Sequence, residues 1–304
     1  MTSILTNVAA MSALSTLRSI SSGMEETQSR VSSGERVGEA SDNAAYWSIA
    51  TTMKSDNMAL SAVSDALGLG ASKVDTAYAG MDAAIDVVKE IKAKLVTATE
   101  EGVDKAKVQE EISQLQEQLM SIAESAAFSG ENWIAGDAAD VTVVSGFVRD
   151  ANNAVSVKTT TYTLDDAADG TLLFGSDGAG GIDDTTGVLG TAGGATIGVS
   201  VYELDISTFD GTEMAEALTL VDEALASMTS AAAELGSIST RIELQEDFVG
   251  SLSDSLDSGI GRLVDADMNE ESTRLKALQT QQQLAIQSLS IANSSSEVIL
   301  SLFR

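Results

Sequence analysis

The sequence predicts a mainly α-helical protein, in which long antiparallel coiled-coil helices are built from both chain ends and a small β-rich insert lies in the middle. Three observations lead to this prediction. Near both ends, apolar residues recur every three or four positions over long stretches, as on one face of a helix. The 304 residues include no proline, so the strongest helix breaker is absent. Of the 25 glycines, 14 lie between residues 129 and 211, where the helical spacing stops.

The first predicted helix ends near Val31. Its apolar stripe consists of Ile4, Val8, Met11, Leu14, Leu17, Ile20 and Met24. Residues 32–43 contain Gly34 and Gly38 among charged side chains, which predicts an exposed, irregular connector. Ser41 or Asp42 is expected to cap the helix that follows, because both side chains can accept a bond from a free amide in its first turn.

A second helix is expected over residues 44–100, followed by a turn at Gly102 and a third helix. The seam of the second helix is Leu60, Val63, Leu67, Gly70, Val74, Tyr78, Met81, Ile85, Val88 and Leu95. Two consecutive steps of four, from Gly70 to Val74 and from Val74 to Tyr78, would locally unwind a supercoil. The third helix has the seam Val108, Ile112, Leu115, Leu119 and Ile122. Because the connection is short, these two helices should be antiparallel neighbours.

The middle of the chain predicts strands, and helical spacing then returns. Alternating apolar and polar residues over 155–164 and 197–206 are typical of half-buried strands. Asp210 followed by Glu213 resembles a helix-starting capping box. The returning seam is Met214, Leu218, Val221, Leu225, Met228, Ala232, Leu235, Ile242, Val249, Leu252 and Leu256.

The last helix is apolar on two faces. One seam is Leu275, Leu278, Gln282, Ala285, Leu289, Ala292, Ser296, Ile299 and Phe303. A second stripe, at seven-residue spacing, is Leu284, Ile291 and Val298. Since the first seam continues past Ser294 and Ser295, we expect an unbroken helix to Phe303. Two apolar faces need two sets of neighbours, and the two terminal helices of one chain supply only one set. We therefore expect other subunits to supply the missing set of neighbours.

Charge separates the ends of the chain from its middle. The net charge is −29, of which residues 1–41 and 261–304 carry −1 each. A strongly acidic body repels nucleic acid and anionic lipid, so neither is an expected partner. No apolar run is long enough for a membrane span, and the first 25 residues lack the pattern of an ordinary secretory signal. Nearly neutral, apolar ends on a soluble acidic body are typical of an assembling protein.

The residues argue against catalysis, cofactors and metals. There is no Cys and no His, which removes thiolate nucleophiles, imidazole bases and the usual zinc ligands. Neither a Gly-x-Ser-x-Gly nor a Ser-x-x-Lys motif occurs. Asp265, Asp267 and Asn269 match the first half of a calcium loop, but Glu270 replaces its turning glycine and Lys276 its closing glutamate. We therefore expect no enzyme activity, no cofactor and no metal site.

Two blocks at the chain ends resemble bacterial flagellins. Near the N-terminus, Ser-Ser-Gly-Glu-Arg-Val at 32–37 precedes Ser-Asp-Asn-Ala-Ala at 41–45 and Ile49-Ala50. Near the C-terminus, Asp-Ala-Asp-Met at 265–268 precedes Glu-Ser-Thr at 271–273, Gln281-Gln282 and the ending Leu-Ser-Leu-Phe-Arg at 300–304. The resemblance covers roughly residues 1–135 and 212–304, and the middle, variable in that family, shows none.

The resemblance implies a structural subunit that is exported and polymerises into the flagellar filament for swimming. Residues 1–41 and 261–304 would form a terminal inner domain, 42–137 and 211–260 a helical shaft, and 138–210 a variable outer insert. Export would occur in an unfolded state through the flagellar channel. The implied partners are other copies of the chain, other flagellins, an export chaperone and the filament cap. The expected assembly interface is Ile4, Val8, Met11, Leu14, Leu17, Leu275, Leu278, Leu284, Ala285, Leu289, Ile291, Ala292, Val298, Ile299 and Phe303.

The chain departs from the flagellin pattern at Tyr46-Trp47-Ser48, which replaces a small Gly-Leu-Ala stretch, and at Ser294 to Ser296, where relatives often have a proline. Three alternatives remain at this point. A hook–filament junction protein shares the two-ended helical design, but the C-terminal block resembles that of the filament subunit. A flagellin with a metalloprotease insert needs a His-Glu-x-x-His motif, which the absence of His excludes. An acidic calcium-dependent surface adhesin is the third alternative.

Overall fold

The computed structural model describes residues 7–150, 154–178, 181–194 and 196–301, with side chains 155 and 295–301 outside the description. The chain divides into two compact units. The terminal unit comprises Met1–Met58 and Ser253–Arg304, and the central unit comprises Ala59–Leu252. The unit boundaries fall inside the two longest helices, α2 (Ala44–Ala98) and α5 (Gly211–Val264). The fold is mainly helical, with the N-terminal helices packed on the C-terminal ones and a small β insert between them, as the sequence predicts.

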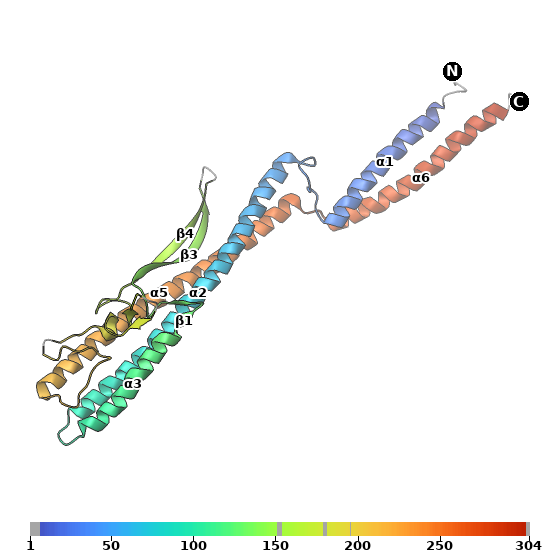
Figure 1. Ribbon diagram of the computed structural model, residues 1–304. Helices are drawn as coiled ribbons and strands as arrows, with labels where there is room; N and C mark the ends of the chain where they lie inside the picture. Colours follow the sequence, from blue (N-terminus) through green and yellow to red (C-terminus); the bar gives the residue numbers. More distant parts are fainter. Residues whose placement is uncertain (1–6, 151–153, 179–180, 195, 302–304) are drawn as a thin grey trace. The chain divides into compact units, whose positions relative to one another are not determined.

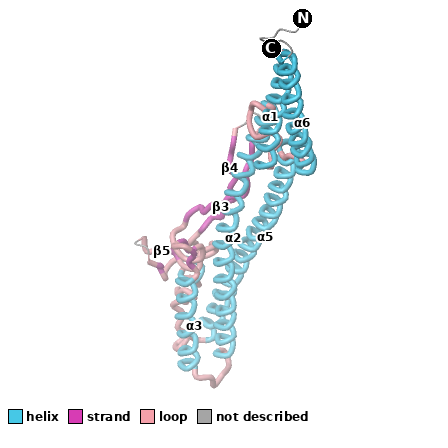
Figure 2. Tube along the Cα trace, turned by 90° about the vertical axis from the view of Figure 1, so that its right-hand side faces the viewer, coloured by secondary structure: helices cyan, strands magenta, loops and turns pink. Residues whose placement is uncertain are grey.

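In the terminal unit, α1 (Val8–Ser33) and α6 (Met268–Ser301) form an antiparallel pair (Figures 1 and 2). At one end of the pair, Asn7 Nδ2 donates to the carbonyl oxygen of Ala292 at 2.9 Å. Near the other end, the Arg30 guanidinium lies 3.4 Å from the Glu271 carboxylate. Asn7 caps α1, and Gly34 ends it in the left-handed conformation at φ 77°, which glycine adopts without steric cost. α6 is continuous through Ser294, whose hydroxyl donates to the Ile291 carbonyl, so the predicted unbroken helix is confirmed as far as Ser301.

The connectors between the helices pair with each other. Glu35 and Asp265 form an antiparallel bridge, and the amides of Arg36 and Val37 donate to the carbonyl of Val264. The predicted irregular connector is therefore present, but the predicted cap of α2 is wrong. Asn43 Oδ1 accepts the Tyr46 amide at 3.1 Å, while Asp42 Oδ2 accepts amides of the preceding loop. Asn43 is the cap because it directly precedes the first helical residue, so its side-chain oxygen reaches the free amides of the first turn.

The central unit is built on α2, α3 (Lys105–Ser125) and α5. Ion pairs join Lys92 of α2 to Asp222 of α5, and Lys94 of α2 to Glu111 of α3. The buried seam of α2 alternates steps of three and four without interruption: Leu60, Val63, Leu67, Gly70, Val74, Ala77, Met81, Ala84, Val88, Ile91, Leu95 and Ala98. The predicted double step of four is therefore wrong, because Ala77 occupies the seam and Tyr78 is 43% exposed.

Alanine also alternates with larger residues along α5. Its buried seam is Met214, Ala217, Val221, Ala224, Met228, Ala231, Leu235, Ile238 and Ile242. Leu218, Leu225 and Ala232, which the sequence placed in this seam, are only half-buried. Asp210 caps α5 as predicted: its side chain accepts the Glu213 amide at 2.9 Å, and Glu213 Oε2 accepts the Asp210 amide at 2.7 Å.

The insert contains a long hairpin and shorter paired segments. β3 (Ala139–Arg149) pairs antiparallel with β4 (Val155–Leu164), and the second of these is the strand predicted for 155–164. The other pairs are β1 (Ala127–Phe128) with β2 (Glu131–Asn132) and β5 (Gly175–Ser176) with β6 (Ile182–Asp183). A single-turn helix, α4 (Gly187–Gly190), follows.

The second strand predicted for the insert, over 197–206, is wrong. The segment is irregular apart from a bridge between Gly193 and Val199. Glutamines of α3 replace the missing strand partner. Gln116 Nε2 donates to the carbonyls of Val201 and Leu204, and Gln109 Oε1 accepts the Ile206 amide. These side chains form the hydrogen bonds that the buried backbone groups would otherwise lack. The apolar periodicity of the segment gives no sign of such bonds.

Candidate assembly surface

The contacting face of the α1–α6 pair is made of small and medium-sized residues. On α1, Ala10, Ala13, Leu17, Ile20 and Met24 are half-buried at helical spacing, and Thr27 is buried. On α6, the half-buried positions are Leu275, Leu278, Gln282, Ala285, Leu289 and Ala292, all members of the predicted first seam. A Cβ at Gly23 of α1 would lie 3.9 Å from the Leu278 methyls, so the helices meet at this level. This seam is therefore used within one chain.

Other predicted residues are left uncovered by this pairing. Val8, Met11 and Leu14 of α1 are 74%, 63% and 38% exposed. Leu284 and Ile291 of α6 are 56% and 68% exposed. Burying such side chains stabilises a contact by about 1.5–3 kcal/mol each, so their exposure on the two helices favours association. We call these five residues the exposed stripe.

Four predicted interface residues lie outside the described part of the structure: Ile4 and Phe303 entirely, and the side chains of Val298 and Ile299. The sequence analysis also missed Ile286, which is 53% exposed on α6. Ile286 belongs to neither predicted stripe, because it stands two residues beyond Leu284 and so projects from another face. The exposure of Ile286 could not be predicted from the sequence, because it depends on which face of α6 the pairing with α1 covers.

A buried carboxylate ties the two helices together. The Glu271 side chain is 6% exposed, and its Oε1 lies 3.4 Å from the guanidinium groups of both Arg30 and Arg274. Arg30 also contacts Glu26, which is 60% exposed. Asp267, one residue of the calcium-like sequence pattern, accepts the Asn269 amide at 2.8 Å as the cap of α6. Its oxygen therefore has a structural role.

The starts and ends of the long helices anchor the terminal unit. Ala50 of α2 packs with Ile260 and Val264 of α5, and Met53 and Leu263 border this cluster. Asn57 Nδ2 donates to Asp257 at 2.6 Å. These contacts hold the connectors that lead into α1 and α6, the two helices that carry the exposed stripe.

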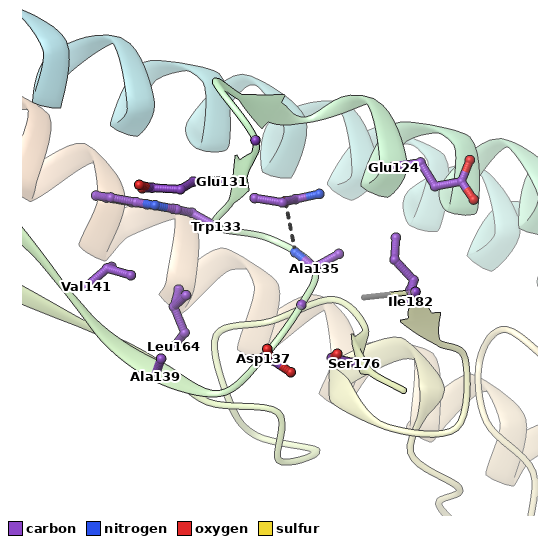
Figure 3. Close-up of a pocket in the computed structure, with 14 residues that line it drawn as sticks. Glu124, Glu131, Trp133, Ala135, Asp137, Ala139, Val141, Leu164, Ser176 and Ile182 are labelled. Atoms are coloured by element: carbon purple, nitrogen blue, oxygen red, sulfur yellow. Dashed lines mark hydrogen bonds between the residues drawn. The ribbon is translucent and has the colours of Figure 1, made fainter. Parts of the chain in front are cut away.

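The central unit contains a pocket of about 560 Å³, whose lining includes Glu131, Asn132 and Trp133 (Figure 3). Its polar groups are engaged in structure: Lys73 bonds Glu131 at 2.7 Å, and Asn132 accepts the amides of Ile134 and Ala135. The hydrogen bond from Lys73 lowers the pKa of Glu131, so this carboxyl stays ionised. Burial raises the pKa of Tyr162, which stacks on Trp133, to about 12, so the phenol stays protonated. Neither Glu131, which lines the pocket, nor Tyr162, which lies behind its Trp133, is therefore an activated acid, base or nucleophile.

Within the described ranges, no group of three acidic, His or Cys side chains is placed to hold a metal ion. None of the described helices is long and apolar enough to cross a membrane.

Comparison with known proteins identifies both ends of the chain. Residues 4–139 match the model of the bacterial flagellin N-terminal helical region, and residues 218–303 match that of the bacterial flagellin C-terminal helical region. Flagellin A of Rhizobium meliloti strain 1021 is 55% identical over an alignment 399 positions long, and Flagellin C of the same strain is 53% identical over one of 324 positions. A flagellin of Brucella melitensis biotype 1 is 45% identical over 305. Each alignment covers 100% of both chains.

Proposed function

The chain belongs to the bacterial flagellins, the structural subunits of the flagellar filament outside the cell, and we propose that it polymerises through the exposed stripe of α1 and α6. It is a structural protein and not an enzyme. The family assignment also sets aside the junction protein and the adhesin considered above.

One observation carries the proposal. The α1–α6 pair uses the first apolar seam, yet Val8, Met11, Leu14, Leu284 and Ile291 stay exposed on the same two helices. A soluble monomer gains nothing from five large apolar side chains in water, whereas a polymer gains the free energy of burying them. The residues of the first seam, such as Leu17 and Leu278, then contribute indirectly by holding the two helices together. Ile4 and Val298 would extend the stripe, whereas Ile299 and Phe303 would continue the first seam.

The same reasoning supports the three-part organisation expected from the sequence. In this proposal residues 1–41 and 261–304 form the inner domain, 42–137 and 211–260 the shaft, and 138–210 the outer insert. The ends carry little net charge and the middle carries most of the −29, so subunits can meet through their ends while the acidic body stays in solvent.

Other flagellins are proposed partners in the same filament. Flagellins A, B, C and D of Rhizobium meliloti are all 51–55% identical to this chain, which is consistent with subunits that share one contact surface. An export chaperone and a filament cap are further proposed partners, since the flagellin resemblance implies both.

Seeded elongation tests the proposed surface. The variant Leu284→Ser/Ile291→Ser removes two side chains of the exposed stripe without touching the α1–α6 seam. We expect elongation of filament seeds to fall by at least about tenfold, because two buried contacts are lost. The control is Gln283→Ser/Gln287→Ser, which changes two exposed polar residues of the same helix. Elongation of both variants at the wild-type rate would exclude the stripe as the assembly surface.

A further inference from the structure

Asn7 forms two hydrogen bonds through the two polar atoms of its side-chain amide, and together they join the two ends of the chain. Its Oδ1 accepts the Ala10 amide at 3.0 Å, which caps α1. Its Nδ2 donates to the carbonyl oxygen of Ala292, within α6, at 2.9 Å. A cap needs only the oxygen, so serine or aspartate would serve equally well there. The second bond needs the amide nitrogen, and capping does not explain it.

Two further contacts define the register in which α1 lies on α6. Gly23 of α1 approaches Leu278, and Arg30 lies beside Glu271. Between these two levels α1 advances by seven residues while α6 falls back by seven, as in an antiparallel pair. At the Asn7 bond, 16 residues from Gly23 along α1, the partner lies 14 residues from Leu278 along α6. The Asn7 bond therefore belongs to the same register.

The apolar seam between α1 and α6 repeats too regularly to fix this register by itself. Its half-buried residues recur at steps of three and four on both helices, so a slip of seven residues would match apolar positions again. A polar contact between two particular residues distinguishes one register from such repeats. Among the residues that the structure describes, two polar contacts join the helices: the Arg30–Glu271 ion pair at one end and the Asn7 bond at the other.

The exposed stripe lies at the Asn7 end of the helix pair. Its three residues on α1 are within seven residues of Asn7 and at least 16 residues from Arg30. At about 1.5 Å per residue, the ion pair is therefore about 24 Å or more along α1 from them and restrains them weakly. On α6, the stripe residue Ile291 directly precedes Ala292, whose carbonyl accepts the Asn7 bond.

We propose that Asn7 is a positioning residue for assembly. Its bond to the Ala292 carbonyl fixes how the stripe residues of α1 are aligned along α6, so that a neighbouring subunit meets the apolar side chains of both helices in one arrangement. A subunit in which this end slips or separates presents the same side chains at other positions and adds to a filament more slowly. The inference rests on the proposed polymerisation through the exposed stripe and names the residue that sets its geometry.

Asn7→Asp separates the two roles of the side chain. The carboxylate still accepts the Ala10 amide, so the cap of α1 and the circular dichroism of the chain should be unchanged. It has no hydrogen to donate, and it places an oxygen against the Ala292 carbonyl oxygen. We expect elongation of wild-type seeds to fall by about fivefold or more. Asn7→Ser, an uncharged cap whose side chain is too short for the second bond, should show the same loss.

The chain offers a matched control in Asn43→Asp. Asn43 caps α2 in the same terminal unit, and its Oδ1 accepts the Tyr46 amide at 3.1 Å. Within the described ranges its amide nitrogen has no bond like the one from Asn7 to α6. The control therefore makes the same chemical change at the same kind of position, and it should elongate at the wild-type rate. Loss of elongation in Asn7→Asp but not in Asn7→Ser would assign the effect to the added charge and overturn the inference.

A spectroscopic measurement tests the alignment itself. The chain has no cysteine, so spin labels can be attached at chosen exposed positions of both helices. Ser12→Cys/Ser288→Cys labels the Asn7 end of the pair, and Gln28→Cys/Thr273→Cys labels the end beside the ion pair. Pulsed electron spin resonance then measures the two distances within one subunit, in filaments where labelled subunits are diluted with unlabelled wild-type chain.

With Asn7→Asp added, the distance distribution at the Asn7 end should broaden by about 5 Å, one helical turn, while that beside the ion pair stays unchanged. If neither distribution changes, Asn7 only caps α1 and the inference is wrong. If both change equally, Asn7 holds the whole pair together instead of aligning one end, and the inference is also wrong. Wild-type chain that forms no filaments would contradict the proposed function, a result distinct from filaments in which Asn7→Asp changes nothing.

Discussion

Glu271 has a buried carboxylate that joins α1 to α6. Its oxygen Oε1 meets Arg30 and Arg274, while Oε2 is buried without a hydrogen-bond partner among the described residues. An ion pair at this depth adds little net stability when intact, but removal of one partner leaves an uncompensated charge away from water. The pair therefore favours one register of the two helices over shifted alternatives.

We predict that Arg30→Met weakens the helix pair by about 2 kcal/mol, since Glu271 then keeps only the half-exposed Arg274. Amides of α1 that exchange through opening of the pair should exchange about 30-fold faster by hydrogen exchange mass spectrometry. The matched control is Glu26→Gln, which removes the exposed partner of Arg30 and should cost at most about 1 kcal/mol. Unchanged exchange in Arg30→Met would show that the seam alone holds the pair.

At the scale of elements, glycine and alanine set how closely the helices and the hairpin approach. Gly70 of α2 is buried, and a Cβ there would collide with the Val143 side chain of β3. Gly80 is similar, because a Cβ would come within 2.7 Å of Ala126 and 2.8 Å of Ile134. The insert of the central unit therefore packs against α2 at Gly70 and Gly80, where no side chain is present.

Gly70→Ala should lower the free energy of unfolding by about 1–3 kcal/mol, because the added methyl overpacks the contact with Val143. Gly68→Ala, two residues away in the same helix, meets nothing within 4 Å and should raise it by about 0.5–1 kcal/mol. Urea unfolding followed by Trp133 fluorescence, in a Trp47→Phe background, measures both. If the two variants had equal effects, the hairpin would not pack on Gly70 in solution. Addition of Val143→Ala to Gly70→Ala should recover part of the loss.

Periodicity predicted the existence and spacing of the helices, but it misplaced their seams by one residue at several points. Tyr78 was preferred to Ala77, and Leu218 to Ala217, because apolar patterns give more weight to large side chains. In an antiparallel pair, small residues at alternate seam positions let the backbones approach, and larger neighbours then flank the seam. The prediction for 197–206 failed for another reason: Gln109 and Gln116, which lie 97 and 85 residues before their partners, form hydrogen bonds with the backbone of this segment.

At the scale of the whole molecule, the sequence predicted an assembling protein from charge and from a helix with two apolar faces. It could not say which of the two apolar sets was already used within one chain. That distinction needed the structure, which covers Leu278 and Leu289 in part and leaves Leu284 and Ile291 exposed. The same limitation hid the exposure of Trp47 and Phe248, because exposure on a packed helix depends on the neighbouring elements and not on the residue type alone.

Membership of the flagellin family shows that the chain is a filament subunit, and its exposed apolar side chains indicate how the subunits contact one another. The central claim is that one apolar seam forms the α1–α6 pair inside each subunit and a separate stripe joins the subunits. The claim also predicts that both ends of the chain are needed for assembly, since α1 and α6 each carry residues of the exposed stripe.

An electron cryo-microscopy map of filaments grown from this chain alone tests that claim most directly. The account predicts that Leu17, Leu278 and Leu289 contact the same chain's partner helix, as in the monomer. It also predicts that Val8, Met11, Leu14, Leu284 and Ile291 are covered by neighbouring subunits. A map in which α1 and α6 keep their pairing while these five side chains face solvent would contradict the account.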